Sequence, residues 1–116
     1  MARGSWRITV RQGPDVEKLS FASLDQALGA TRERIERVRR EGGLPPINAL
    51  RDFPPGQRVH ARIELVGPRR MRPPRAGIDV MGDGSIVAYR GTLSKEPLGA
   101  DSLEQALDRV GEALGG

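Results

Sequence analysis

The side chains with the clearest capacity to bind a ligand are the arginines of the segment GPRRMRPPR, residues 67–75. Proline restricts the backbone and donates no amide hydrogen, so the prolines of this segment are expected to hold it extended. Guanidinium groups that project into water can make paired hydrogen bonds to phosphate or carboxylate oxygens. The segment therefore predicts an anion-binding loop whose basic side chains are Arg69, Arg70, Arg72 and Arg75.

Further basic side chains are expected on the polar face of a sheet. Apolar and polar residues alternate from Arg58 to Val66 and from Trp6 to Gln12, which is typical of half-buried strands. This alternation predicts that Arg58, Arg62 and Arg11 point away from the core and extend the anion-binding surface. A solvated surface with no ligand is the alternative, because a GC-rich genome also enriches a chain in arginine, glycine and proline.

Catalytic chemistry has little support in the sequence. The single histidine, His60, lies between two arginines on a predicted strand and is expected to be solvated. Glu64 and Asp79 are the acids expected on the outward face of the sheet, and they are expected to pair across strands with Arg62 and Arg90. The sequence therefore predicts a protein that is not an enzyme.

Metal and cofactor sites are not predicted either. The chain has no cysteine, which excludes disulfides and the cysteine-containing zinc motifs. The run from Asp79 to Gly84 resembles the start of a calcium loop, but Met81 and Arg90 stand where oxygen ligands are required. No glycine-rich turn joins a strand directly to a helix, as a phosphate-binding cradle requires.

Two hairpins are predicted to position these residues. In the first, a turn over residues 13–16 would place Val10 opposite Leu19 and Ile8 opposite Phe21. In the second, Asp83-Gly84 would close a two-residue turn. That turn would place Ile78 opposite Tyr89 and Val80 opposite Val87, with both Tyr89 and Val87 on the apolar face.

Each hairpin is followed by a predicted amphipathic helix. Ser23-Leu24-Asp25-Gln26 and Ser102-Leu103-Glu104-Gln105 are capping boxes, and apolar residues recur at helical spacing after each. The similar hexamers SLDQAL and SLEQAL suggest a duplicated ββα unit around one linking strand. Independent helices that need the same cap and the same apolar stripe would give the same hexamer.

These elements predict an α+β fold with two layers, in which about five mostly antiparallel strands carry two helices on one face. The length of 116 residues is typical of a single domain spanning residues 1–116. Two segments rich in proline and glycine, residues 42–57 and 67–75, are expected to be irregular connections.

The C-terminal region resembles HicB-type antitoxin domains. Predicted strands lead into LGADSLEQALDRVGEAL, which is similar to the helix of that family that opens with a Ser/Thr-Leu-Glu-x-Ala-Leu run. The Pro-Gly-Cys type of loop before the helix and a separate DNA-binding tail are missing here. The resemblance implies a domain that binds another protein.

These observations predict a small binding or adaptor domain that contacts nucleic acid or an acidic protein through its basic loop. The alternatives are a structural domain that self-associates through a strand edge, and the antitoxin-like protein-binding domain. No signal peptide or membrane span is expected, so the sequence indicates a complete, cytoplasmic chain. Basic residues exceed acidic ones before residue 77 and acidic residues exceed basic ones after it, which is consistent with a localised anion-binding surface.

Overall fold

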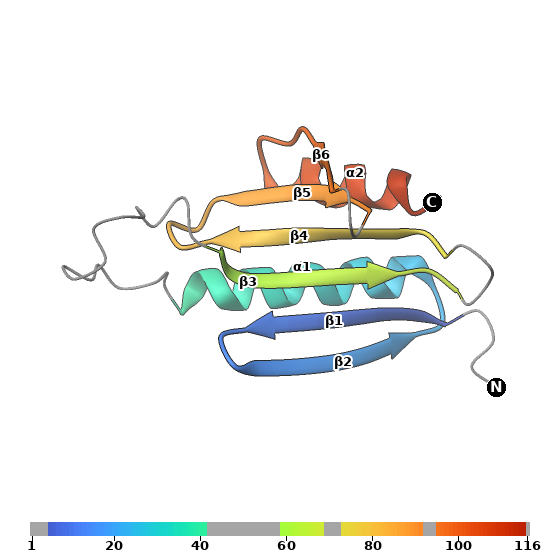
Figure 1. Ribbon diagram of the computed structural model, residues 1–116, viewed down its shortest axis with the longest axis horizontal. Coiled ribbons are helices and arrows are strands. Elements are labelled where there is room, and N and C mark those ends of the chain that lie inside the picture. The colour runs from blue at the N-terminus through green and yellow to red at the C-terminus, as the bar shows by residue number, and fades with distance from the viewer. Residues whose placement is uncertain (1–4, 42–58, 69–72, 92–94, 116) are drawn as a thin grey trace.

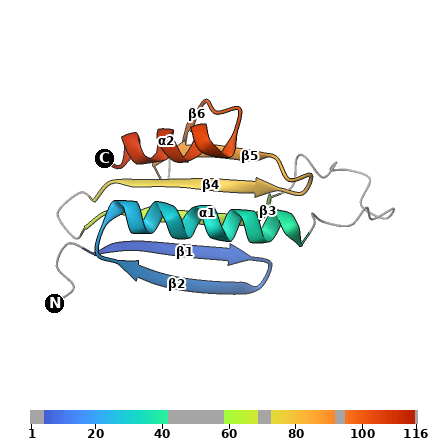
Figure 2. The ribbon, with the colours of Figure 1, turned by 180° about the vertical axis from the view of Figure 1, so that it is seen from behind.

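The strands and helices of this chain form two layers. The computed structural model describes residues 5–41, 59–68, 73–91 and 95–115. Its elements are, in chain order, β1 (Trp6–Gln12), β2 (Asp15–Phe21), α1 (Leu24–Arg40), β3 (Val59–Val66), β4 (Arg75–Met81), β5 (Ile86–Arg90), β6 (Glu96–Leu98) and α2 (Leu103–Ala113). The sheet is antiparallel with strand order β2-β1-β3-β4-β5-β6, and both helices cover the same face of it (Figures 1 and 2). The predicted two-layer α+β class is confirmed, and β6 is a strand that the sequence did not predict.

Both helices begin at the predicted capping boxes. The Ser23 hydroxyl accepts a hydrogen bond from the Gln26 amide at 3.1 Å, and the Gln26 side chain accepts one from the Ala22 amide at 3.1 Å. Ser102 and Gln105 repeat this arrangement at the start of α2. These contacts satisfy amides of the first turn that have no partner within the helix, which fixes where each helix starts.

The core lies between the sheet and the helices. Its fully buried side chains come from the four central strands and from the predicted stripes of both helices: Ile8, Ala61, Ile63, Leu65, Ala76, Ile78, Val80, Ala88, Ala27, Ile35, Ala106 and Val110. Ile63 and Val80 lie in this core as expected, and Leu28 packs against it while partly buried. Aliphatic side chains from both layers therefore hold the helices on one face of the sheet.

The first hairpin is tighter than predicted. Ile8 pairs with Leu19 and Trp6 with Phe21, so the turn contains only Gly13 and Pro14. Gly13 has a φ of 59°, as the first central residue of a type II′ turn requires. The predicted register was wrong by two residues, and a shift of two leaves every side chain on its predicted face.

The second hairpin differs by one residue from the prediction, which has a larger consequence. Ile78 pairs with Ala88 and Val80 with Ile86 around a three-residue turn, Gly82-Asp83-Gly84, in which Gly84 has a φ of 88°. A shift of one residue moves each side chain of β5 to the other face. The prediction that Tyr89 and Val87 face the helices was therefore wrong, and the side chain of Val87 is exposed on the opposite face.

The connections fall partly outside the described residues. Residues 42–57 lie there, as do residues 69–72 of the predicted connection 67–75. The ends of the second connection meet, because the Gly67 amide donates to the Pro74 carbonyl at 2.8 Å and Arg75 already belongs to β4. β6 stands between the second hairpin and α2, so only the first half of the chain has the simple ββα order.

One observation bears on membranes. Neither α1 nor α2, the helices of the described residues, is both long and apolar enough to cross a bilayer.

Candidate functional site

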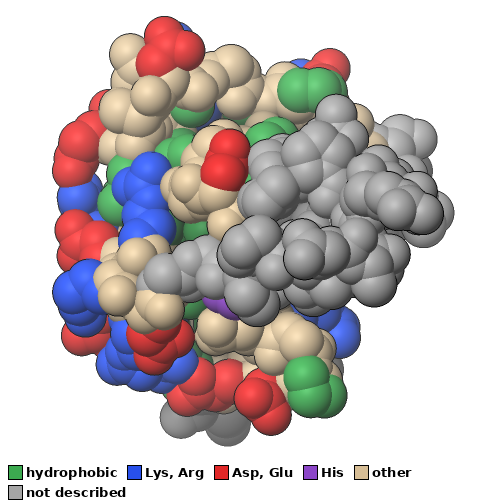
Figure 3. Space-filling model, turned by 90° about the vertical axis from the view of Figure 1, so that its left-hand side faces the viewer, with side chains coloured by type: hydrophobic (Ala, Val, Ile, Leu, Met, Phe, Trp, Pro, Cys, Tyr) green, Lys and Arg blue, Asp and Glu red, His purple; other side chains and the backbone are tan. Residues whose placement is uncertain are grey.

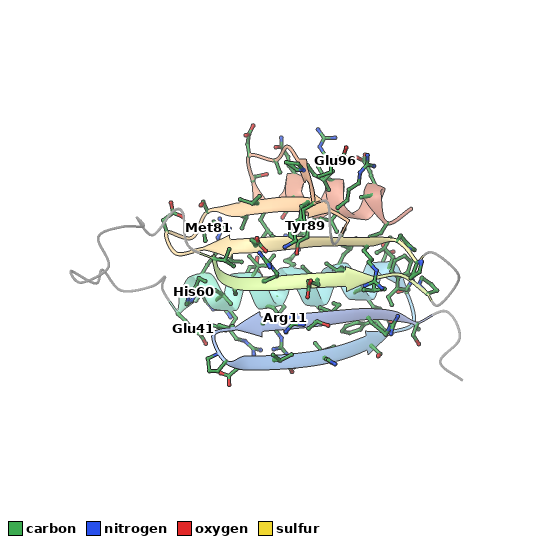
Figure 4. All side chains as sticks on the ribbon, viewed as in Figure 1. Arg11, Glu41, His60, Met81, Tyr89 and Glu96 are labelled. Carbon is green, nitrogen blue, oxygen red and sulfur yellow. The ribbon has the colours of Figure 1, made fainter. Side chains whose placement is uncertain are left out.

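The sheet face opposite the helices carries most of the predicted binding residues. We call it the open face, because neither helix covers it, and Figure 4 views it with Arg11 and Tyr89 labelled. The strand registers align its side chains in rows across the sheet. Among the described residues, the charged side chains that its strands carry are Arg7, Arg11, Lys18, Arg62, Arg75, Glu64 and Asp79. Basic side chains therefore outnumber acidic ones on this face.

Arg62 is engaged by a neighbouring carboxylate. Its Nε and Nη2 donate to the two carboxylate oxygens of Asp79 at 2.8 and 3.0 Å, across the pairing of β3 with β4. Asp79 is buried, with 8% of its surface exposed. This bidentate pair neutralises the buried charge of Asp79 and stabilises the contact of β3 with β4. Arg62 therefore has little capacity left to bind an external anion.

Arg11 is held differently. Only its Nε contacts a carboxylate, Oε1 of Glu64, at 3.2 Å. Its two terminal amino groups have no hydrogen-bond partner among the described residues. Glu64 therefore orients the guanidinium group while leaving the end of it free to bind. The predicted pairing of these acids with Arg62 and Arg90 is correct for Arg62, which pairs with Asp79. Glu64 pairs with Arg11 instead, and Arg90 pairs with Glu96.

Three further cations of the open face have no carboxylate partner within the described part of the chain: Arg7, Lys18 and Arg75. The helix layer is different, because its basic side chains mostly contact acids. These ion pairs are Arg32 with Glu104, Arg34 with Glu17, Arg37 with Glu33 and Arg109 with Glu112. In Figure 3, where the helices lie on the left, blue and red side chains accordingly intermingle along that side.

A cleft of about 310 Å³ opens on the same face. Arg11, Lys18 and Arg75 line it together with Thr9 and Glu64, and Val66 and Tyr89 add less polar walls. The register explains the arrangement, because Lys18, Thr9, Glu64, Gly77 and Tyr89 form one row across five strands. The structure thus brings Arg11 and Arg75, both predicted from the sequence, into one cleft.

Tyr89 is the residue of this surface that the sequence analysis placed wrongly. Its ring lies across Gly77, which has no side chain to occupy that space, and the Lys95 ammonium sits 4.8 Å from the ring centroid. The ring is 4% exposed, and its hydroxyl has no hydrogen-bond partner among the described residues. Burial, with a smaller contribution from the charge of Asp79, raises the pKa of the Tyr89 hydroxyl. The glycines around Asp83 were the available signal, since they permit the three-residue turn that turns Tyr89 to the open face.

Four of the predicted binding residues are not described by the structure. Arg58, Arg69, Arg70 and Arg72 lie outside the described residues. His60 lies within hydrogen-bond distance of Gln12, with 3.4 Å between the two Nε2 atoms. Within the described ranges, no group of three or more His, Asp or Glu side chains could hold a metal ion.

Comparison with known proteins adds no assignment. No protein-family model, no curated protein and no solved structure matches the chain. The likeness of the C-terminal segment to HicB-type antitoxin domains therefore stays an expectation from the sequence, and the function has to be argued from the open face.

Proposed function

We propose that this chain is a binding domain whose open face, together with the predicted basic segment 69–72, contacts the phosphate backbone of nucleic acid. The observation that supports the proposal is the set of basic side chains on an uncovered sheet face, Arg7, Lys18 and Arg75, that have no carboxylate partner within the described part of the chain. Unpaired cations attract a polyanion and release its counterions when it binds, which is the main source of sequence-independent affinity.

The position of these cations favours one end of the sheet. Arg7 and Arg75 flank Val66 in adjacent strands, and Val66 leads directly into the connection that contains the predicted basic loop. Pro68 and Pro73 are described and bracket residues 69–72. The proposal includes Arg69, Arg70 and Arg72 because they lie in the sequence between these two described prolines.

Base reading is not expected. Single-stranded RNA is commonly recognised by aromatic rings exposed on a sheet, on which bases stack. Tyr89 is the aromatic residue of the open face in the described part of the chain, and its ring is covered. Contacts to phosphate without base stacking give binding that depends little on sequence.

Self-association through a strand edge is less favoured. β2 forms an edge of the sheet, and among the described elements only β1 pairs with it. Asp15, Glu17 and Lys18 lie on this strand, however, and charged side chains on an edge strand oppose pairing with a second copy. An acidic protein remains an anionic partner that the same cations would attract, and the experiment below separates it from nucleic acid.

The test is a salt titration of binding to mixed-sequence DNA and RNA. The variant R7Q/R75Q should bind more weakly than the native protein to every sequence, and its dependence on salt should fall by about 0.9 log units per log unit of salt for each duplex phosphate that it no longer neutralises. The matched control R37Q/R109Q removes the same charge from the helix layer and should bind like the native protein. Absence of binding near 50 mM salt, or an equal weakening in the control, would contradict the proposal, and binding to an acidic peptide alone would reassign the partner.

A further inference from the structure

We infer that the cleft lined by Arg11, Lys18 and Arg75 is a binding site for one sugar-phosphate unit, with the phosphate on the cations and a sugar hydroxyl on Glu64. This inference rests on the proposed function in so far as it uses the same face of the sheet. It goes further, because it assigns one cleft of this face and the chemical class of its ligand.

The cations of the cleft are suited to a phosphate group. Arg11 is fixed through its Nε by Glu64, and its terminal amino groups have no partner among the described residues. Two parallel N–H donors on a planar guanidinium match two oxygens of a phosphate. Lys18 and Arg75 line the same cleft with no carboxylate partner in the described ranges. Arg62 is excluded from this role, because Asp79 occupies its Nε and Nη2.

The rest of the cleft indicates more than a bare phosphate. Its volume of about 310 Å³ is at the lower end of the range for small-molecule sites, about 300 to 1,000 Å³. Inorganic phosphate, with a single central atom and four oxygens, leaves much of that space empty. Thr9, Glu64 and the partly buried Val66 also line the cleft, beside the cations, and they offer hydrogen-bonding groups and an apolar surface.

Glu64 sets the orientation of the ligand. One oxygen of its carboxylate holds Arg11, and the other has no hydrogen-bond partner within the described residues. A carboxylate accepts a hydrogen bond from a hydroxyl and repels a phosphate. Glu64 lies on β3, between Lys18 of β2 and Arg75 of β4, so the sugar hydroxyl faces Glu64 and the phosphate lies to one side of it, at the terminal amino groups of Arg11 and the Lys18 ammonium. The Arg11–Glu64 pair thereby separates the two ends of the ligand.

Isothermal titration calorimetry with ribose 5-phosphate, inorganic phosphate and ribose tests this assignment. Ribose 5-phosphate should bind saturably and more tightly than inorganic phosphate, and ribose alone should not bind. R11Q should weaken ribose 5-phosphate binding by roughly tenfold or more, since it removes charge-assisted hydrogen bonds. R7Q is the matched control, because Arg7 lies on the same strand and face outside the cleft lining, and it should change the affinity by less than about twofold, an order-of-magnitude allowance for an exposed charge.

Several results would overturn the inference: no saturable binding, equal affinity for inorganic phosphate, or equal weakening in R11Q and R7Q. Amide shifts in NMR spectra give a second readout, and they should concentrate at residues 9–11, 64–66 and 75–77. A dinucleoside monophosphate as a further probe shows whether the unit is recognised within a nucleic-acid chain or only as a free monoester. If the protein binds DNA or RNA but not ribose 5-phosphate, this inference is wrong and the proposed function stands. If it binds ribose 5-phosphate but neither DNA nor RNA, the proposed function is wrong and this inference stands.

Discussion

Tyr89 shows at the scale of one residue how the open face departs from an ordinary solvated sheet surface. A buried hydroxyl without a partner loses its hydrogen bonds to water on folding, and a tyrosinate at that position would lose far more. The side chain fills the space above Gly77 and forms part of the wall of the cleft, and these apolar contacts offset the loss.

The ionisation of Tyr89 gives the first prediction at this scale. It is the only tyrosine of the chain, so the rise of absorbance near 295 nm in a pH titration reports it alone. Burial raises the pKa of its hydroxyl, and native protein should therefore titrate well above the ordinary value of about 10, with a return to about 10 in urea.

The same shift makes stability depend on pH in the alkaline range. Above about pH 10 the unfolded chain loses the tyrosine proton while the native protein keeps it, so the free energy of unfolding should fall as the pH rises. The variant Y89F should lack this part of the decline. Native titration close to 10 would show that the hydroxyl is exposed and would contradict the packing described for it.

At the scale of elements, the fit of β5 on β4 depends on one glycine. An ideal Cβ at Gly77 would lie 2.4 Å from the Tyr89 hydroxyl oxygen and 2.8 Å from the Ile63 carbonyl oxygen. G77A should therefore destabilise the protein by about 1 to 3 kcal/mol, as overpacking of a well-packed site does. Urea melts measure the change.

A second glycine supplies the control for this prediction. Gly29 lies within α1, and a Cβ there would meet no atom within 4 Å. G29A should stabilise the protein by about 0.5 to 1 kcal/mol, because alanine loses less backbone freedom in a helix. A destabilising G29A together with a neutral G77A would mean that the local packing of both elements is misdescribed.

The elements themselves could be predicted from the sequence, and the reasons are local. Capping boxes and apolar stripes specify both helices, because the contacts that start a helix lie within four residues. Alternation likewise specifies the faces of β1 and β3, since one face of each strand is apolar and the other is polar. β6 was missed because it has only three residues and contains Pro97, which no strand pattern favours.

The register of β5 could not be derived in the same way. Both faces of β5 carry apolar side chains, Ile86 and Ala88 on one face and Val87 and Tyr89 on the other. Alternation therefore cannot tell which face is turned toward the core. Only the length of the Gly82-Asp83-Gly84 turn decides, and the sequence permits both two and three residues there. Because of this ambiguity, the sequence analysis placed Tyr89 on the apolar face and did not include it in the candidate site.

At the scale of the whole molecule, charge is distributed between the two layers in a way that sequence counts do not show. Arginine occurs in both layers, but the tertiary structure gives Arg32, Arg34, Arg37 and Arg109 of the helix layer acidic partners. Arg7 and Arg75 of the open face have none among the described residues. The choice of partners depends on which strands are adjacent. The strand order, which patterning leaves open, therefore determines which of the predicted cations are available to a ligand.

Two of the helix-layer ion pairs join separate elements and lead to a prediction for the whole fold. Arg34 of α1 binds Glu17 of β2, and Arg32 of α1 binds Glu104 of α2. The hydrogen bond from its arginine holds the pKa of each of these two carboxyls below its ordinary value of about 4.5. A lowered pKa in the native state stabilises the fold above the ordinary value, and this stabilisation is lost as the pH falls through the native pKa.

Urea midpoints measured between pH 7 and pH 3 test this expectation. The native protein should lose stability as the pH falls below about 4.5, and the variant E17Q/E104Q should lose less, because its glutamines do not titrate. The matched control E33Q/E112Q also removes two carboxylates, but their ion pairs with Arg37 and Arg109 lie within single helices, so its acid dependence should follow that of the native protein. Equal acid dependence in all three proteins would mean that the contacts of α1 with β2 and α2 do not depend on these charges, and that apolar packing alone holds the helix layer to the sheet.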